Sequence, residues 1–180
     1  MVDNNKTKVI TGKARFSYAN VWEPKSINGG DEKYSVSLII PKDDKKTINE
    51  IKAAIDVAKQ EGKAKLGGKI PANLKTPLRD GDIDRQDDEA YQNSYFINAN
   101  SKDKPQIVDK NVKPILDQSE VYSGCYGRAS VTFYAFNSNG NKGIACGLGN
   151  LQKLADGEPL SGRSRAEDDF TSADDDDFLS

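Results

Sequence analysis

The sequence predicts a mainly β protein built around one small barrel. Three observations lead to this fold class. Five or six segments show strand patterns, one segment shows a strong helical pattern, and long polar stretches separate them. Few strands with a single helix favour a five- to six-stranded Greek-key barrel of the OB-fold type. We therefore expect an OB-fold variant with one amphipathic helix, a long polar insertion and a disordered acidic C-terminal tail.

Length and composition fit one folded domain, expected over residues 1–160, and a flexible acidic tail over 161–180. The chain has 180 residues, of which 36% are hydrophobic, enough for one modest core. No apolar run approaches the ~20 residues of a membrane-spanning helix. The N-terminus lacks a basic-then-apolar signal peptide. The sequence thus predicts a soluble, non-secreted protein without a membrane partner.

The composition also limits the chemistry. The chain contains no histidine, which excludes Ser-His-Asp and Cys-His catalysis and histidine-ligated metals. The two cysteines, Cys125 and Cys146, are too few for a disulfide framework or a four-cysteine zinc site. We expect both to be small buried residues. The sequence predicts a protein that is not an enzyme and has no cofactor.

Two alternating segments form the first strands. Residues 8–18 alternate between an apolar set and a set of basic and hydroxyl side chains, the pattern of a half-buried strand. Residues 33–40 repeat the alternation. The polar face of the first segment is basic, which favours contact with an anion. The aromatic residues that we assign to the core are Phe16, Tyr34 and Phe133.

Residues 43–61 carry the one convincing helix pattern. Thr47 and Glu50 have the spacing of a capping box, and apolar residues recur along one helical stripe. Residues 62–92 then form the long polar insertion, which has no clean period. Its acidic run, residues 80–89, offers carboxylates for a hydrolytic metal site, although a solvated loop is the simpler interpretation.

The remaining strands lie in the second half of the chain. Residues 92–100 form a third strand, and residues 106–109 form a short extended piece. Residues 124–136 and 142–154 form a long hairpin around the Asn-Gly dipeptide at 139–140, a strong two-residue turn. Together these segments supply enough strands to close the barrel.

The strand at 124–136 carries the strongest binding signal. Its odd positions, from Gly127 to Ala135, suit a core face, whereas its even positions mix arginine, hydroxyl groups and aromatic rings. Single-stranded nucleic acid needs positive charge for its phosphates and aromatic faces for its bases. In the alternative interpretation, the last two aromatic residues cover a second small core. The expected DNA-binding residues of this strand are Tyr126, Arg128, Tyr134 and Phe136.

A second group of candidates borders the first inter-strand loop, expected at residues 19–25. Trp22, the only tryptophan, lies in this stretch. It serves either as a stacking platform, because this loop of an OB fold borders the binding face, or as a plug for one end of the barrel. Lys13, Arg15 and Lys25 are expected to supply phosphate contacts nearby.

Charge is unevenly distributed along the chain. Residues 166–180 carry seven acidic side chains and no basic one, whereas residues 1–165 carry all 26 basic groups and the other 21 acidic ones, a net charge of +5. We expect the tail to compete with DNA for the basic body and to recruit partner proteins. The acidic block with an aromatic anchor consists of Asp174, Asp175, Asp176, Asp177 and Phe178.

Several blocks, in order, resemble the single-stranded DNA-binding proteins of tailed bacteriophages, long classed as a domain of unknown function. They cover most of residues 11–163: TGKARFSYANVWEPK, KYSVSLIIPK, NSYFINANSKDKPQ, VYSGCYGRASVTFYAF and KGIACGLGNLQKLADGEPLSGR. The resemblance implies an OB-fold variant, sequence-independent binding of single-stranded DNA, and a role in phage replication and recombination. It also implies a polymerase, helicase–primase or nuclease as partner of the tail, and the cytoplasm of an infected or prophage-carrying bacterium as location.

The leading prediction is thus a non-enzymatic protein that coats single-stranded DNA by aromatic stacking and basic phosphate contacts. Two alternatives come from other classes. One is a metal-dependent nuclease that uses the acidic run 80–89, and the other is an adaptor that binds no nucleic acid. The +5 body and the aromatic residues outside the expected core favour DNA binding over the adaptor. The sequence leaves the oligomeric state open, with a homodimer as one alternative.

Overall fold

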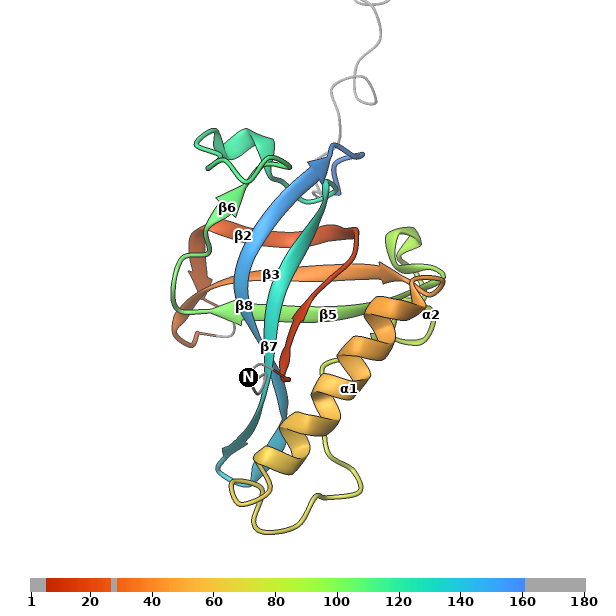
Figure 1. Ribbon diagram of the computed structural model, residues 1–180, viewed down its shortest axis with the longest axis vertical. Helices are drawn as coiled ribbons and strands as arrows, with labels where there is room; N and C mark the ends of the chain where they lie inside the picture. The colour runs from red at the N-terminus through yellow and green to blue at the C-terminus, as the bar shows by residue number, and fades with distance from the viewer. Residues whose placement is uncertain (1–5, 27–28, 161–180) are drawn as a thin grey trace, which may run out of the picture.

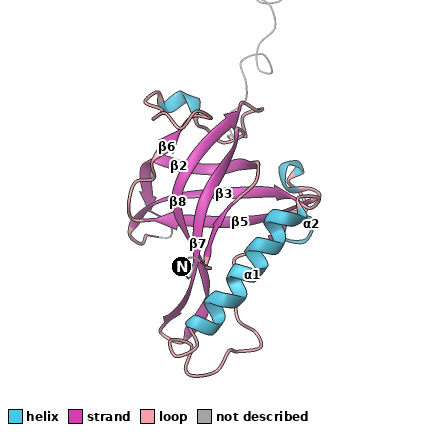
Figure 2. Ribbon diagram, viewed as in Figure 1, coloured by secondary structure: helices cyan, strands magenta, loops and turns pink. Residues whose placement is uncertain are grey.

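The computed structural model describes residues 6–26 and 29–160, which form one eight-stranded sheet and one long helix (Figures 1 and 2). Two single-turn 3-10 helices also occur, at Glu89–Tyr91 and Gln118–Glu120. The elements in chain order are β1 (Lys8–Ile10), β2 (Ala14–Ser26), β3 (Glu32–Pro41), α1 (Lys45–Glu61), β4 (Arg79–Asp80), α2 (Gly81–Asp84), β5 (Ser94–Ser101), β6 (Ile107–Val108), β7 (Tyr126–Ser138) and β8 (Asn141–Ala155).

Five of these strands close into a barrel. β2 pairs with β3 and β3 with β5, both antiparallel, and β5 then pairs with β8 in parallel. β8 pairs with β7 along nearly its whole length, and β7 pairs back with β2. This closed order of five strands is that of a Greek-key OB barrel, so the predicted fold class is confirmed. β1, β4 and β6 are short strands added to its edges.

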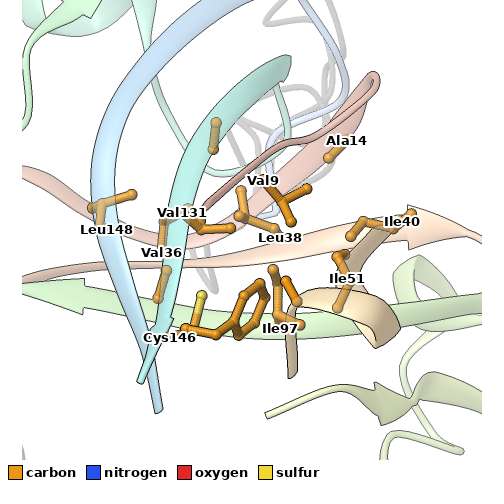
Figure 3. Close-up of a cluster of buried hydrophobic side chains, with 14 of the residues drawn as sticks. Val9, Ala14, Val36, Leu38, Ile40, Ile51, Ile97, Val131, Cys146 and Leu148 are labelled. Carbon is orange, nitrogen blue, oxygen red and sulfur yellow. The ribbon is translucent and has the colours of Figure 1, made fainter. Parts of the chain in front are cut away.

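The barrel encloses one main hydrophobic core, which α1 extends. Phe16, Leu38, Ile97 and Phe133 are almost fully buried within it. Figure 3 shows Ile51 of α1 pointing into the same cluster as the inward side chains of the strands. The helix packs along β1, β7 and β8 (Figure 1). Burial of this apolar stripe, rather than helix propensity alone, holds α1 on the barrel.

The start of α1 differs from the expected capping box. The helix begins at Lys45, and its N-cap is Asp44, whose side chain accepts a hydrogen bond from the Thr47 backbone N–H. The Thr47 hydroxyl is used elsewhere, because it accepts a hydrogen bond from the Gly12 backbone N–H at 2.9 Å. The predicted capping box is therefore wrong, and Thr47 instead joins the helix to the turn between β1 and β2.

The first strand and the first loop were also predicted incorrectly. The segment 8–18 is split into β1 and β2, and residues 19–25 continue β2 instead of forming a loop. The pairing of β2 with β3 shifts register between Ser17 and Asn20 and again before Lys25. These bulges break the alternation from which a strand is recognised in a sequence.

Smaller differences concern the core and the insertion. Phe16 and Phe133 are buried as expected, but Tyr34 is only half-buried at the start of β3 and lies outside the core cluster. The polar insertion contains β4, α2 and a 3-10 turn and folds back against β5. No helix within the described ranges 6–26 and 29–160 is long and apolar enough to cross a membrane.

Candidate nucleic-acid interface

The outer face of β2, β3 and β5 presents polar side chains in register. Across β3 and β5, Ser35 lies opposite Asn100 and Ser37 lies opposite Asn98. On the other side of β3, Ser35 also lies opposite Asn20. Directly paired residues of neighbouring strands project to the same side of a sheet. In an OB fold, this face of the second and third barrel strands, here β3 and β5, is the surface that binds oligonucleotides.

A groove of about 530 Å³ runs over this face, and we call it the open groove. Two cations, Lys25 and Arg85, lie along its walls, and no carboxylate belongs to its lining among the described residues. Hydroxyl and amide groups form its floor. Positive charge beside many neutral hydrogen-bonding groups suits a phosphate backbone with bases of any sequence. The polar lining comprises Asn20, Ser26, Ser35, Ser37, Asn98 and Asn100, and the aromatic lining is Tyr18.

Tyr18 is the exposed aromatic residue of the open groove. It lies at the first bulge of β2 with a φ of 47°, a left-handed conformation that is uncommon for a bulky residue. Its side chain is 62% exposed. The bulge thus turns a ring that would continue the strand's inward parity out into solvent. An exposed ring in a strained conformation is a feature of binding sites, where the ligand covers the ring.

Arg85 reaches the open groove from the end of α2. Its guanidinium lies 5.3 Å from the centroid of the Phe96 ring and 5.8 Å from that of Tyr91. These rings stack at right angles in a small second core with Ile39. The Tyr91 hydroxyl is 3.0 Å from the Ser37 hydroxyl, which fixes the insertion on the sheet. Packing on aromatic rings holds the Arg85 charge at the groove while leaving its N–H groups available to a phosphate.

A second hollow, the Tyr126 pocket, lies on the same outer face beyond this small core. Its lining includes Lys13 and Arg15, which the sequence predicted as phosphate contacts, and Tyr126, predicted to stack on bases. The Lys13 ammonium lies 4.9 Å from the centroid of the Tyr126 ring. Arg15 lies opposite Ile39 of β3, and Ile39 alternates with Ser37 and Ser35 of the open groove. The structure therefore brings these three predicted residues together on the face that also carries Lys25.

The chain that leads to the acidic tail leaves the barrel beside the Tyr126 pocket. Arg15 donates hydrogen bonds to the carbonyl oxygens of Gly124, at 3.1 Å, and Glu158, at 2.7 Å. Gly124 has a φ of +116°, and a Cβ there would overlap the Glu158 carbonyl, so only glycine fits this crossing. Leu160 then packs against the small second core. Residues after 160 thus start next to a basic and aromatic pocket.

Four predicted residues lie away from this face. Arg128 projects from β7 and donates two hydrogen bonds to the Gln152 side chain, at 3.0 and 2.6 Å. Tyr134 is exposed further along β7, and the Phe136 ring is half-buried over Gly143. Their outward orientation follows the predicted alternation of β7, but they do not join the open groove.

Trp22 is the fourth of these residues, and it lies in β2 rather than in a loop. Its side chain is half-buried against the core, and its indole N–H donates to the Val121 carbonyl at 3.0 Å. The Lys104 ammonium lies 5.9 Å from its ring centroid in a shallow apolar hollow. The tail residues predicted to bind partners, Asp174–Asp177 and Phe178, lie outside the described residues.

The acidic run 80–89 is organised by hydrogen bonds and ion pairs. Lys42 contacts the carboxylates of both Asp80 and Asp82, at 2.9 and 2.8 Å. The hydrogen bond from Lys42, followed by that from the Asn93 backbone, lowers the pKa of Asp82. Asp80 and Asp88 cap the short helices that follow them. Within residues 6–26 and 29–160, no three histidine, cysteine or acidic side chains are grouped so that they could hold a metal ion.

Comparison with known proteins places this geometry in a family. The family model described as the single-stranded DNA-binding protein of Enterobacter phage Enc34 matches residues 7–179. The chain belongs to this phage single-stranded DNA-binding protein family. A curated relative, protein p50 of Acyrthosiphon pisum secondary endosymbiont phage 1, is 30% identical over 184 residues, covering 96% of this chain and 98% of p50. The family resemblance found in the sequence is therefore confirmed.

Solved structures of two phage proteins share the fold. The Enc34 protein in complex with single-stranded DNA has a TM-score of 0.75 and 24% identity, covering 89% of this chain and 96% of that chain. Its C-terminally truncated form also has a TM-score of 0.75, with 22% identity over 89% of this chain and 95% of that one. The single-stranded DNA-binding protein gp2.5 of bacteriophage T7 has a TM-score of 0.58 and 16% identity, covering 90% and 91%. At these identities the likeness concerns the fold.

Proposed function

We propose that this protein binds single-stranded DNA without sequence preference along the outer face of β2, β3 and β5. The open groove carries the proposal: it joins an exposed ring, Tyr18, to two cations, Lys25 and Arg85, with no carboxylate among its described lining residues. The site has no base-specific geometry, because its polar groups are spread along the strands instead of forming a closed pocket. Membership of the phage family and the DNA bound to the Enc34 protein support the same ligand.

The proposed DNA path continues from the open groove to the Tyr126 pocket. Lys13 adds a charge there, and Tyr126 offers a second ring for stacking. Arg15 contributes mainly by position, because its guanidinium already donates to two backbone carbonyls. Trp22, Arg128, Tyr134 and Phe136 stay predictions for an extended path around the barrel.

We further propose that the acidic tail competes with DNA for this path and, once displaced, recruits replication proteins such as a polymerase, helicase–primase or nuclease. The support is the position of Leu160, which brings the start of the tail next to the Tyr126 pocket. The seven acidic side chains of residues 166–180 face a body of net charge +5. Such attraction is strongest at low salt, where screening is weak.

The proposed setting is phage DNA replication and recombination in the cytoplasm of the bacterial host, with the protein acting without catalysis. A homodimer is the alternative to a monomer, and sedimentation of the DNA-free protein would decide between them.

Titration of labelled oligo-dT with the full chain and with residues 1–165 at several salt concentrations tests the proposal. We expect affinity to fall with a log–log slope of about −0.7 per phosphate contact, and the truncated chain to bind more tightly at low salt. Absence of binding by both chains would overturn the DNA-binding proposal. Equal affinity of the two chains would overturn the competition alone.

A further inference from the structure

A separate groove of about 300 Å³ lies between β1, β7, β8 and the loop after β6. It shares no lining residue with the open groove or the Tyr126 pocket. We propose that this groove, the Val112 groove, binds the acidic segment Asp174–Leu179 of the same chain, with Phe178 between Ile10 and Val112. The inference rests on the proposed role of the tail and assigns its phenylalanine-bearing block a resting place outside the DNA path.

The Val112 groove offers an apolar site of the right kind. Ile10 on one wall is 59% exposed and Val112 on another is 69% exposed, two of the few large apolar side chains in the described chain that face solvent. Ala129 and Leu151 line the groove between them and are almost fully buried. An aromatic ring placed here would remove both exposed side chains from water, a gain of about 25 cal/mol per Å² of apolar surface.

The conformation of Val112 indicates that its exposure is built into the loop. Its φ is +64°, an outlier for a β-branched residue. The turn is held by Asp109, whose carboxylate accepts hydrogen bonds from the backbone N–H groups of Asn111 and Lys113. Asparagine or glycine would fit this conformation better, so the valine costs stability and exposes an isopropyl group. A ligand that covers the side chain would explain both costs.

The charge around the Val112 groove matches the aspartates that precede Phe178. Arg128 lines the groove, and its hydrogen-bond partner is the neutral Gln152 amide, which leaves the guanidinium charge uncompensated by any carboxylate among the described residues. Gln152 also donates to the Asp109 and Lys110 carbonyls, so one side chain orients both the arginine and the loop.

An adjoining hollow of about 690 Å³ extends this positive surface. It shares Ile10, Lys8 and Arg128 with the Val112 groove and adds Lys6 and Lys46. Glu50 is the one carboxylate in its described lining. Four cations against one anion, beside an apolar notch, complement a run of four aspartates that ends in phenylalanine and leucine.

The segment can reach the groove from its own chain. Gln152 lines the groove and Leu160 follows eight residues later, so the two lie at most about 28 Å apart. Residues 161–173 span up to about 45 Å when extended, and about 20 Å as a flexible coil. Linkers of this length give effective concentrations in the millimolar range. The same chain is therefore a better source of the segment than a second copy.

A spin label attached to the full chain at Ser180→Cys tests the proposal. Cys125 and Cys146 are buried, and burial raises the pKa of both thiols, so the new cysteine reacts selectively. Methyl relaxation then reports which side chains approach the label. We expect at least a threefold larger relaxation enhancement for Ile10 than for Ile83, an equally exposed isoleucine in α2.

Two substitutions in the labelled chain provide the matched comparison. Val112→Asn keeps a residue that tolerates positive φ but removes the apolar wall, so the enhancement at Ile10 should fall severalfold without loss of fold. Ile83→Asn removes an exposed apolar residue elsewhere and should leave it unchanged. Equal enhancement at Ile10 and Ile83, or no effect of Val112→Asn, would overturn the proposal.

Two further measurements identify the source of the segment and separate this inference from DNA binding. Enhancement in a mixture of labelled chains and isotope-enriched unlabelled chains would show docking from a second copy and overturn docking within one chain. Saturating oligo-dT should leave the enhancement at Ile10 in place, and its loss would show that the groove belongs to the DNA path. Binding of oligo-dT, followed in the same samples, tests the proposed function independently.

Discussion

Replacement of Tyr18 by alanine is the sharpest test of the open groove. A base stacked on an aromatic side chain contributes about 1–3 kcal/mol. The Tyr18 ring is 62% exposed, so one face and its edge are available to a base while the rest touches the sheet. We therefore expect the lower part of this range, about 1–2 kcal/mol, which weakens the affinity for oligo-dT about 5- to 30-fold.

Fluorescence anisotropy of labelled oligo-dT with the full chain measures this loss. The salt dependence should not change, because no charge is removed, and thermal stability should stay within about 0.5 kcal/mol, since the side chain is exposed. Tyr18→Phe keeps the ring and should bind as the unchanged protein does. Tyr134→Ala is the matched control from β7. Full affinity in Tyr18→Ala together with a large loss in Tyr134→Ala would refute the reasoning and place the bases on β7.

Further predictions concern charge, pH and packing. Lys25→Gln and Arg85→Gln should each weaken binding and reduce the log–log salt slope by about 0.7, as measured in the same titrations. Asp82→Asn should lower the melting temperature at pH 7, because the bond from Lys42 depresses the Asp82 pKa; this stabilisation is full above the ordinary value of 3.8 and is lost as pH falls through the lower folded-state value. Ile51→Ala should cost about 2–5 kcal/mol of unfolding free energy in a denaturant titration, since Ile51 is fully buried.

Much of the barrel could be predicted because its long strands alternate cleanly. The odd positions of β7, from Gly127 to Ala135, are buried and its even positions are not, as the sequence indicates. The helix was evident from its apolar stripe. By contrast, the second half of β2 contains two register shifts, and its alternation is lost in the sequence. The N-cap of α1 was misassigned because two suitable residues, Asp44 and Thr47, lie within one turn.

The candidate site was only partly accessible from the sequence. Lys13, Arg15 and Tyr126 are brought together because β2 and β7 pair at their first residues, but that pairing links segments more than 100 residues apart. Tyr18 shares the parity of core residues in the sequence, and only the bulge turns it outward. Arg85 lies in an insertion without a period, and its place depends on the small core around Tyr91. An exposed aromatic residue next to a predicted bulge is the signal that could have identified Tyr18.

Photo-crosslinking tests the central claim most directly. Oligo-dT that carries 5-iodouracil would be irradiated in complex with the full chain, and the crosslinked residues identified by mass spectrometry. The account predicts crosslinks at Tyr18 and Tyr126, the rings of the open groove and the Tyr126 pocket. Crosslinks confined to Tyr134 and Phe136, with none on the outer face of β2, β3 and β5, would contradict it.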